Sequence, residues 1–247
     1  MVRLSVNVNK IATIRNSRGG SVPRVLEAVR ACVDAGVQGI TVHPRADRRH
    51  ITPDDVREIA GALAARRPTV EYNIEGDPRP ELLALVKEVR PDQCTLVPVV
   101  PGEITSQAGW TSGILSGLPE AVRDLKAHGV RVSVFIDPTE EAVRLAASVG
   151  ADRVELYTEP YARAFERGPV EALESFGAYA RTAEMAHDAG LGINAGHDLD
   201  LENLTLFRTL PHLDEVSIGH AIISRAVFVG LDRVVGEYLA ALEGTKV

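Results

Sequence analysis

Short apolar runs rich in β-branched residues alternate along this chain with longer stretches in which apolar residues recur at helical spacing. Runs of this length and composition are typical of buried strands. The longer stretches are typical of amphipathic helices that cover them. The pattern predicts eight strand–helix units, with strands at residues 4–9, 39–44, 69–74, 93–99, 130–137, 153–158, 192–196 and 215–220.

Parallel strands joined by helical crossovers can remain an open, doubly wound sheet or close into a barrel. An open dinucleotide-binding sheet would carry a GxGxxG turn after its first strand, and this sequence has no such turn there. Eight units and a length of 247 residues are typical of a closed barrel. No Pro/Gly/Ser-rich linker or low-complexity tract divides the chain. We therefore expect an α/β fold in which residues 1–247 form a single (β/α)8 TIM barrel.

The expected helices carry capping signals at their boundaries. Thr52 followed by Pro53 is typical of a helix start. Irregular stretches at residues 102–117 and 161–169 follow strands, where barrel enzymes place functional loops. Glycine, which tolerates the left-handed backbone at a helix end, closes four of the helical stretches, at Gly36, Gly129, Gly150 and Gly190.

The composition limits the kinds of partner and the cellular compartment that we expect for this protein. The formal net charge is −7, whereas a general nucleic-acid surface needs a basic excess, so we expect no nucleic-acid partner. No apolar run approaches the ~18 residues of a membrane span, and the first residues lack the pattern of a secretory signal, so we expect no membrane association. Cys32 and Cys94 lie in apolar runs outside any CxxC pattern, which indicates reduced core thiols in a cytoplasmic protein.

The carboxyl ends of the expected strands are unusually polar. In a barrel these ends converge on one face, and side chains two apart on a strand point to the same side. Any one of these residues could merely hydrogen-bond to a neighbour, but charged groups from five strands are costly to bury together unless they are paired or used. We therefore predict an active site at this face, formed from Asn7, Asn9, Lys10, His43, Arg45, Glu71, Asn73, Glu155, Tyr157, Asn194, His197, Gly219 and His220.

Residues 43–50 concentrate two histidines and three arginines directly after the second strand. The planar fork of arginine suits phosphate, which favours an anion-binding loop. The alternative is a solvated basic loop in which Asp47 pairs internally. His43 and His50 could also suggest a metal, but no HxH, HExxH or cysteine cluster supports one, so we expect no metal ion.

A second anion site is predicted after the last two strands. His197 and His220 each follow a glycine there, and glycine lets the backbone approach an oxyanion. A helix that starts near Ala221 would present free N–H groups to the same anion. The alternative is that both glycines only turn the chain.

Arg15 and Arg18 precede Gly19 and Gly20 in the segment after the first strand. This arrangement is compatible with a basic loop that folds over a bound anion and equally with a plain flexible loop.

Two anion sites around histidine and glutamate indicate an enzyme that joins or rearranges phosphorylated carbonyl compounds by proton transfer.

Eight runs occur in order along nearly the whole chain: LSVNVNKIATIRNSRGG, ITVHPRADRRHI, VEYNIEG, LVP…EITSQAG, VFID, VELYTEPYA, INAGHDL and IGHAIISRAVFVGL. Together they resemble the pyridoxine 5′-phosphate synthase family. The resemblance implies a closed barrel with additional helices, a homo-octamer, and no metal or organic cofactor. It implies a transferase that condenses two small phosphorylated substrates, 1-deoxy-D-xylulose 5-phosphate and 3-amino-2-oxopropyl phosphate, into pyridoxine 5′-phosphate, phosphate and water.

The resemblance also gives roles to individual residues. The catalytic roles fall on the general base His43, the second proton acceptor Glu71, the proton donor His197 and the transition-state stabiliser Glu155. The residues that resemble ligands of the deoxyxylulose phosphate are Arg45, His50 and Thr105. Those that resemble ligands of the amino ketone phosphate are Asn7, Arg18, Gly219 and His220.

The sequence departs from the family pattern at three places. Asn9 and Lys10 stand where many members carry Asp-His, Asp198 stands where glycine is usual, and residues 99–102 lack the basic side chain often found there. We place Asn9, Lys10 and Asp198 among the substrate-binding residues. The alternatives are a barrel aldolase or isomerase for another phosphorylated carbonyl compound, or a non-catalytic phosphometabolite-binding barrel. The binding protein would have no reason to keep all four catalytic side chains.

Overall fold

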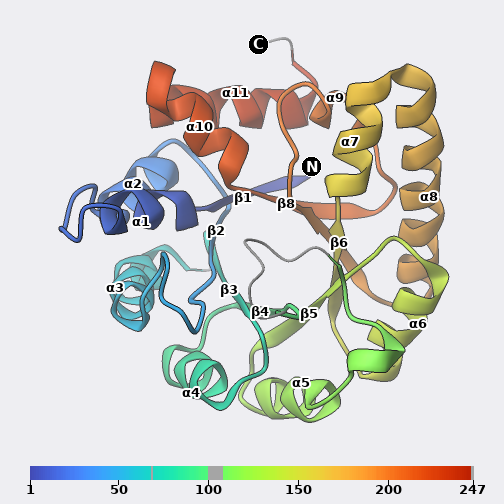
Figure 1. The fold of residues 1–247 in the computed structure, drawn as a ribbon, viewed down its shortest axis with the longest axis horizontal. Helices are drawn as coiled ribbons and strands as arrows, with labels where there is room; N and C mark the ends of the chain where they lie inside the picture. The colour runs from blue at the N-terminus through green and yellow to red at the C-terminus, as the bar shows by residue number, and fades with distance from the viewer. Residues whose placement is uncertain (68, 100–107, 246–247) are drawn as a thin grey trace.

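The computed structural model describes residues 1–67, 69–99 and 108–245. Within these ranges eight parallel strands pair in chain order, and the barrel closes because β1 also pairs with β8. Helices surround this barrel (Figure 1). The expected α/β class and closed barrel are confirmed. The strands are β1 (Arg3–Asn7), β2 (Gly39–Val42), β3 (Glu71–Gly76), β4 (Gln93–Leu96), β5 (Arg131–Ile136), β6 (Arg153–Tyr157), β7 (Gly192–Gly196) and β8 (Leu213–Ile218).

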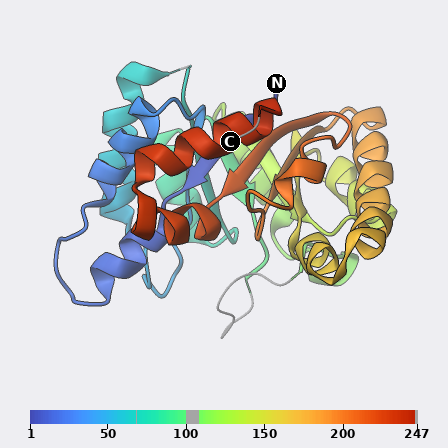
Figure 2. The same ribbon diagram turned by 90° about the horizontal axis from the view of Figure 1, so that it is seen from above.

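The helices include more than one per strand, as expected. In the described chain, β1, β6 and β8 are each followed by two α-helices, and Figure 2 shows the last two, α10 and α11, crossing one side of the barrel. The α-helices are α1 (Asn9–Asn16), α2 (Val25–Asp34), α3 (Pro53–Leu63), α4 (Pro80–Val89), α5 (Leu118–Ala127), α6 (Glu140–Ser148), α7 (Glu159–Arg167), α8 (Pro169–Asp188), α9 (Leu204–Phe207), α10 (His220–Val229) and α11 (Leu231–Glu243), with 3-10 turns at Ala64–Arg66 and Ser112–Ile114.

The capping signals act as predicted. The Thr52 side chain accepts a hydrogen bond from the backbone N–H of Asp55, and the Asp55 carboxylate accepts one from the backbone N–H of Thr52, which forms a capping box at the start of α3. The four glycines expected at helix ends all have positive φ, between 78° and 100°.

Strand β3 begins two residues later than predicted. The backbone N–H of Thr69 donates to the carbonyl of Arg66, which keeps Thr69 in the preceding turn. Pairing with β4 continues as far as Gly76, opposite Leu96. Strands β1 and β8 likewise end two residues earlier than expected, because α1 and α10 begin directly after them. These shifts decide which side chains reach the carboxyl end of the barrel.

The prediction of an irregular stretch at residues 161–169 is also wrong, because most of these residues belong to helix α7. Pro160 lies in the first turn of α7, where its missing N–H is harmless. Gly168, at φ 140°, ends the helix and lets α8 start at once. Of the stretch at residues 102–117, residues 102–107 lie outside the described residues.

The hydrophobic core lies between the barrel and its surrounding helices. Alternate strand residues point outward into this layer, where side chains such as Leu4, Val6 and Ile40 are fully buried. Cys32 and Cys94 are buried there as free thiols, as predicted. The inward residues at mid-height are polar instead, namely Ser5, Thr41, Asn73, Thr95, Ser133, Glu155, Asn194 and Ser217.

None of the helices in the described ranges is both long enough and apolar enough to cross a membrane.

Candidate active site

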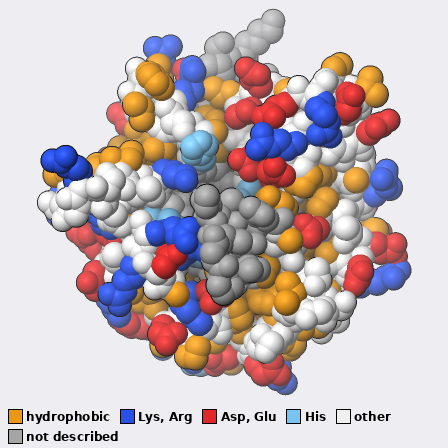
Figure 3. All heavy atoms as spheres, in the orientation of Figure 1, with side chains coloured by type: hydrophobic (Ala, Val, Ile, Leu, Met, Phe, Trp, Pro, Cys, Tyr) orange, Lys and Arg blue, Asp and Glu red, His pale blue; other side chains and the backbone are white. Residues whose placement is uncertain are grey.

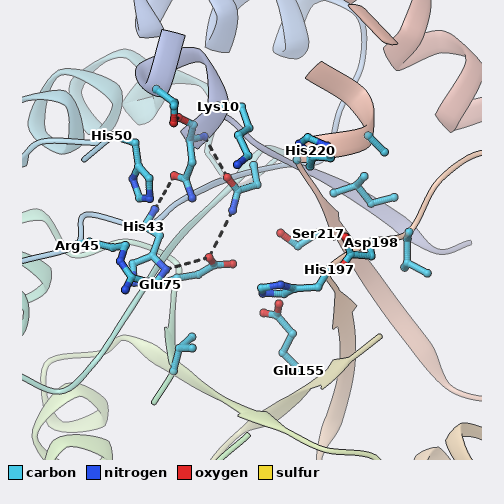
Figure 4. Close-up of a pocket in the computed structure, with 18 of the residues that line it drawn as sticks. Lys10, His43, Arg45, His50, Glu75, Glu155, His197, Asp198, Ser217 and His220 are labelled. Carbon is cyan, nitrogen blue, oxygen red and sulfur yellow. Dashed lines mark hydrogen bonds and ion pairs between the residues drawn. The ribbon is translucent and has the colours of Figure 1, made fainter. Parts of the chain in front are cut away.

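A pocket of about 340 Å³ opens at the carboxyl ends of the strands. Figure 4 shows its side chains converging from α1, from the ends of β3, β6, β7 and β8, and from the segment after β2. In the space-filling view, lysine, arginine and histidine side chains gather beside this mouth (Figure 3). Its lining includes Asn7, Asn9, Lys10, Thr13, His43, Arg45, Arg49, His50, Glu75, Val97, Glu155, His197, Asp198, Leu199, Ser217, Ile218, Gly219, His220 and Ala221.

One corner of the pocket is basic. Lys10, in the first turn of α1, lines the same pocket as Arg45 and His50, which follow β2 (Figure 4). Burial and the charge of Arg45 together lower the pKa of His50 to about 4. The His50 ring is therefore a neutral hydrogen-bonding group, while Lys10 and Arg45 supply positive charge. This combination suits a phosphate. Arg49 pairs with Asp47 inside the loop, as the alternative reading of residues 43–50 expected.

Arg15 anchors the loop that forms this corner. Its guanidinium forms two hydrogen bonds with the carboxylate of Asp55 and a third, at 3.3 Å, with the carbonyl of His50. The side-chain amide of Asn16 also donates to that carbonyl, at 2.8 Å. The idea that Arg15 belongs to a loop closing over an anion is therefore wrong, because its guanidinium is already paired.

The floor of the pocket carries an acid–base cluster. The Nδ1 atom of His43 lies 3.8 Å from Oε2 of Glu75, and the same oxygen accepts a hydrogen bond of 3.4 Å from the amide of Asn7. Glu155, from β6, lies beside His197 on the other side of the floor (Figure 4). Backbone contacts hold the cluster in place: the side-chain oxygen of Asn9 accepts from the N–H of His43 at 2.9 Å.

Burial dominates the protonation of this cluster. Burial lowers the pKa of His43 well below its ordinary value, and the neighbouring imidazoles of His50 and His197 and the guanidinium groups of Arg45 and Arg79 also disfavour a charge on His43. Burial raises the pKa of Glu155 to about 7. His43 is thus neutral and able to accept a proton, whereas Glu155 titrates in the physiological range and can hold or release one.

We expect the stability of the protein to record the titration of Glu155. A carboxyl whose pKa rises from about 4.5 to about 7 on folding stabilises the fold fully below the lower value, and this contribution is lost as pH rises through the higher one. Glu155→Gln removes the group, so the unfolding free energy of the wild type relative to the variant should decline between about pH 5 and about pH 8. Denaturant unfolding at several pH values measures this difference, and parallel curves would contradict it.

His197 sits on a strained turn at the end of β7. His197 and Asp198 are non-glycine residues with positive φ, at 78° and 55°. The hydroxyl of Thr158 donates to the carbonyls of Gly196 and His197, which holds this backbone. Burial lowers the pKa of His197, while the neighbouring Asp198 carboxylate opposes that shift. A proton donor gains from such a counter-charge, because it keeps the imidazolium accessible.

The imidazole of His197 also packs against two aromatic rings. The ring centroid lies 5.1 Å from that of Phe135 and 5.5 Å from that of Tyr157. These contacts fix the orientation of the ring over the pocket.

The opposite corner of the pocket lies at the start of α10. Gly219 precedes the helix, and a Cβ there would lie 2.9 Å from the carbonyl oxygen of Asn7, so a larger residue would push β1 and α10 apart. The close approach brings Asn7, Ser217 and the first N–H groups of α10 to one wall. Such N–H groups favour a bound anion.

The structure brings most of the predicted site residues together. Eleven of the predicted residues line one pocket: Asn7, Asn9, Lys10, His43, Arg45, His50, Glu155, His197, Asp198, Gly219 and His220. The exposed Arg18 lies in the turn after α1 and is not part of the lining. Thr105 lies outside the described residues.

Glu71 is not at the mouth, and the prediction that placed it there is wrong. It is the first residue of β3, at the amino end of the barrel, where its carboxylate accepts hydrogen bonds from Arg3, at 2.9 Å, and from Arg131. The carboxylate that β3 delivers to the pocket is Glu75, four residues later. The period-two pattern of EYNIE puts both glutamates on the inward face, so only the strand boundary could have distinguished them.

Closed barrel topology and an acid–base pocket at the carboxyl ends of the strands define a (β/α)8-barrel enzyme. The chain belongs to the family described as pyridoxal phosphate biosynthesis protein PdxJ, whose model matches residues 4–244.

Curated relatives match the chain over almost its full length. A pyridoxine 5′-phosphate synthase of Christiangramia forsetii is 49% identical over 245 residues, covering 98% of this chain and all of the relative. One from Cytophaga hutchinsonii is 50% identical over the same shares. Among solved structures, phosphoribosyl anthranilate isomerase from Thermotoga maritima matches with a TM-score of 0.63 at 16% identity, over 99% of this chain and 100% of that one. That likeness concerns the fold alone.

Proposed function

We propose that this protein is a pyridoxine 5′-phosphate synthase, a transferase that condenses 1-deoxy-D-xylulose 5-phosphate with 3-amino-2-oxopropyl phosphate. The observation that carries the proposal is the pocket itself, which places His43, Glu155 and His197 between a basic corner and a helix N-terminus. Relatives at about half identity over the full chain carry the same activity in their names.

The two corners are suited to the two phosphates. In the proposal, Arg45 and His50 bind the phosphate of the ketose, and Lys10 contacts the same phosphate or a hydroxyl near it. Asn7 and the Gly219-His220 backbone bind the phosphate of the amino ketone. Asp198, between the proton donor and this second corner, carries a charge complementary to the substrate amine. Roles for Arg18 and Thr105 rest on the family resemblance.

The acid–base cluster then moves protons between the bound substrates. The amine adds to the ketose carbonyl, and loss of water gives an imine; loss of one phosphate and an aldol-type ring closure follow. Neutral His43 accepts protons from the reacting carbons and oxygens, and His197 protonates departing oxygen atoms. Glu155 stabilises the positive charge that develops on nitrogen. The amine of the substrate takes the place of a catalytic lysine, so the scheme uses neither a metal nor an organic cofactor.

We further propose a cytoplasmic homo-oligomer, an octamer by family resemblance. Two apolar side chains at the end of α10 support self-association: Val227 is 68% exposed and Phe228 is 87% exposed. Isolated molecules rarely leave neighbouring large apolar groups in water.

The direct test is to mix purified protein with both substrates. We expect pyridoxine 5′-phosphate and inorganic phosphate to appear together, with neither formed when one substrate is omitted. Chromatography with absorbance detection follows the ring product, and a phosphate assay follows the leaving group. If a folded preparation consumes neither substrate, the synthase proposal is wrong; if it consumes one alone, an aldolase or isomerase reaction replaces it.

A further inference from the structure

We propose that Thr158 is a positioning residue for His197: its hydroxyl clamps the turn at the end of β7 in the conformation that aims the imidazole into the pocket. The consequence for turnover rests on the proposed function, whereas the effect on the imidazole does not.

Thr158 joins two neighbouring strands just beyond the point where their pairing ends. It follows β6 directly, is fully buried, and is not among the residues that line the pocket. Its backbone N–H donates to the carbonyl of Gly196 at 3.1 Å, and its hydroxyl donates to the same carbonyl at 2.6 Å and to that of His197. The last register pair of β6 and β7 is Tyr157 with Gly196, so Thr158 extends the contact by one residue. The turn that carries His197 is thereby attached to β6.

The other interpretation of Thr158 is a helix cap. It lies at the N-cap position of α7, where a threonine side chain commonly accepts a hydrogen bond from the helix backbone. In the described structure the Thr158 side chain makes no such capping bond. Helix α7 begins instead with Glu159 and Pro160, a carboxylate and a missing N–H that both suit a helix start. The hydroxyl therefore serves β7 and not its own helix.

The turn after β7 needs a clamp because its backbone is strained. Of the five non-glycine residues with positive φ in the described ranges, His197 and Asp198 are the two that are adjacent. The left-handed region brings the Cβ of an L-residue too close to the backbone, so two such residues in succession persist only where their surroundings hold them. Asn203, which is 3% exposed, adds a hydrogen bond of 3.0 Å to the carbonyl of Asp198. Two buried side chains thus hold three successive carbonyls.

The same turn sets the direction of the imidazole. Figure 4 shows the ring of His197 turned toward the centre of the pocket, with the carboxylate of Glu155 beside it. The ring centroid lies 5.1 Å from that of Phe135 and 5.5 Å from that of Tyr157, the last residue of β6. Gly196 fits so closely against Glu155 that a Cβ there would lie 2.6 Å from Oε1. A turn that shifted would therefore move the ring relative to its aromatic neighbours and to the acid.

The test compares Thr158→Val with Thr158→Ser. Valine keeps the shape of threonine and removes the hydroxyl, whereas serine keeps the hydroxyl. We expect Thr158→Val to lower kcat by about 10- to 100-fold, because a displacement of about 1 Å is enough to impair a proton donor. KM should change little, since the proposed phosphate contacts come from other residues. Thr158→Ser should recover most of the lost kcat.

The matched control is Thr182→Val. Thr182 is also buried, and its hydroxyl donates at 3.0 Å to a backbone carbonyl, that of Ala178 in α8. It is not among the residues that line the pocket. Its replacement removes the same kind of hydrogen bond without touching the turn after β7, so kcat should not change.

A second readout is independent of turnover. Diethyl pyrocarbonate modifies accessible neutral imidazoles, and mass spectrometry of peptides measures the rate at each histidine. The released ring of His197 should react several-fold faster in Thr158→Val than in the wild type, and at the wild-type rate in Thr158→Ser. The exposed His128 serves as the internal standard.

An unchanged modification rate at His197 in folded Thr158→Val would overturn the proposal whatever its kcat. A normal kcat in that variant would also overturn it, as would a kcat in Thr158→Ser no higher than in Thr158→Val. If Thr158→Val does not fold, Thr158→Ala takes its place. If the wild type itself lacks turnover, the synthase proposal fails, while the modification rates still decide whether Thr158 holds the imidazole.

Discussion

Replacing His43 with alanine is expected to abolish turnover while leaving substrate binding measurable. The substitution removes the buried neutral imidazole that lies beside Glu75 on the floor of the pocket, and loss of a general base lowers kcat by about 10²- to 10⁴-fold. The phosphate contacts come from other residues, chiefly Arg45, His50 and the start of α10, so each substrate should still bind. Calorimetry with one substrate at a time measures binding without reaction.

The matched control for this prediction is His128→Ala. His128 is an exposed histidine directly after α5, hydrogen-bonded to the carbonyl of Asp124, and it is not among the residues that line the pocket. Its removal should leave kcat unchanged. Normal turnover in His43→Ala would remove His43 from the catalytic role, and loss of binding of both substrates would show that His43 builds the pocket instead.

Removing Glu71 is expected to affect stability and leave the chemistry nearly intact. Glu71→Ala leaves Arg3 and Arg131 without their shared carboxylate at the amino end of the barrel. Breaking a fully buried pair costs ~3–5 kcal/mol, but both arginines are about one-third exposed, so we expect a loss of about 2 kcal/mol. Glu215, whose pKa burial and the charge of Glu71 raise to about 8, would then ionise more easily and offset part of this loss.

Denaturant unfolding and kcat, both measured where the variant is fully folded, separate the two possible roles of Glu71. Reduced stability with near-normal kcat agrees with the structural pairing. A collapse of kcat in folded Glu71→Ala would restore the second proton acceptor implied by the family resemblance. Glu75→Gln, which removes the carboxylate that β3 delivers to the pocket, should lose turnover while the protein remains folded, and so makes the comparison decisive.

The fold was accessible from sequence because its signals are local and repeated. Eight apolar runs of strand length, separated by amphipathic helices with glycine ends, exclude most other architectures. The helix caps at Thr52 and at the four glycines depend on neighbours only a few residues away, so they were predicted correctly. The ends of the strands were harder to predict, because the pairing partner of a residue such as Gly76 lies in another strand.

Most of the pocket was predictable for a related reason. Polar residues such as His43, Glu155 and His197 occur at the ends of strands, and a parallel barrel collects those ends on one face. The sequence does not show which side chain pairs with a given arginine in the folded protein. The glycines after Arg15 are compatible with a basic loop over an anion, yet Arg15 pairs with Asp55, forty residues away in the chain.

The sequence by itself therefore determined the barrel, its closure and the residue types at its mouth, since these follow from periodicity and from the order of the strands. Only the tertiary structure decided between Glu71 and Glu75. Both glutamates share the inward face of β3, and a shift of two residues in pairing moves one carboxylate to the arginines at the amino end and the other to His43. Register depends on contacts between distant segments, and those contacts placed Glu75 in the pocket.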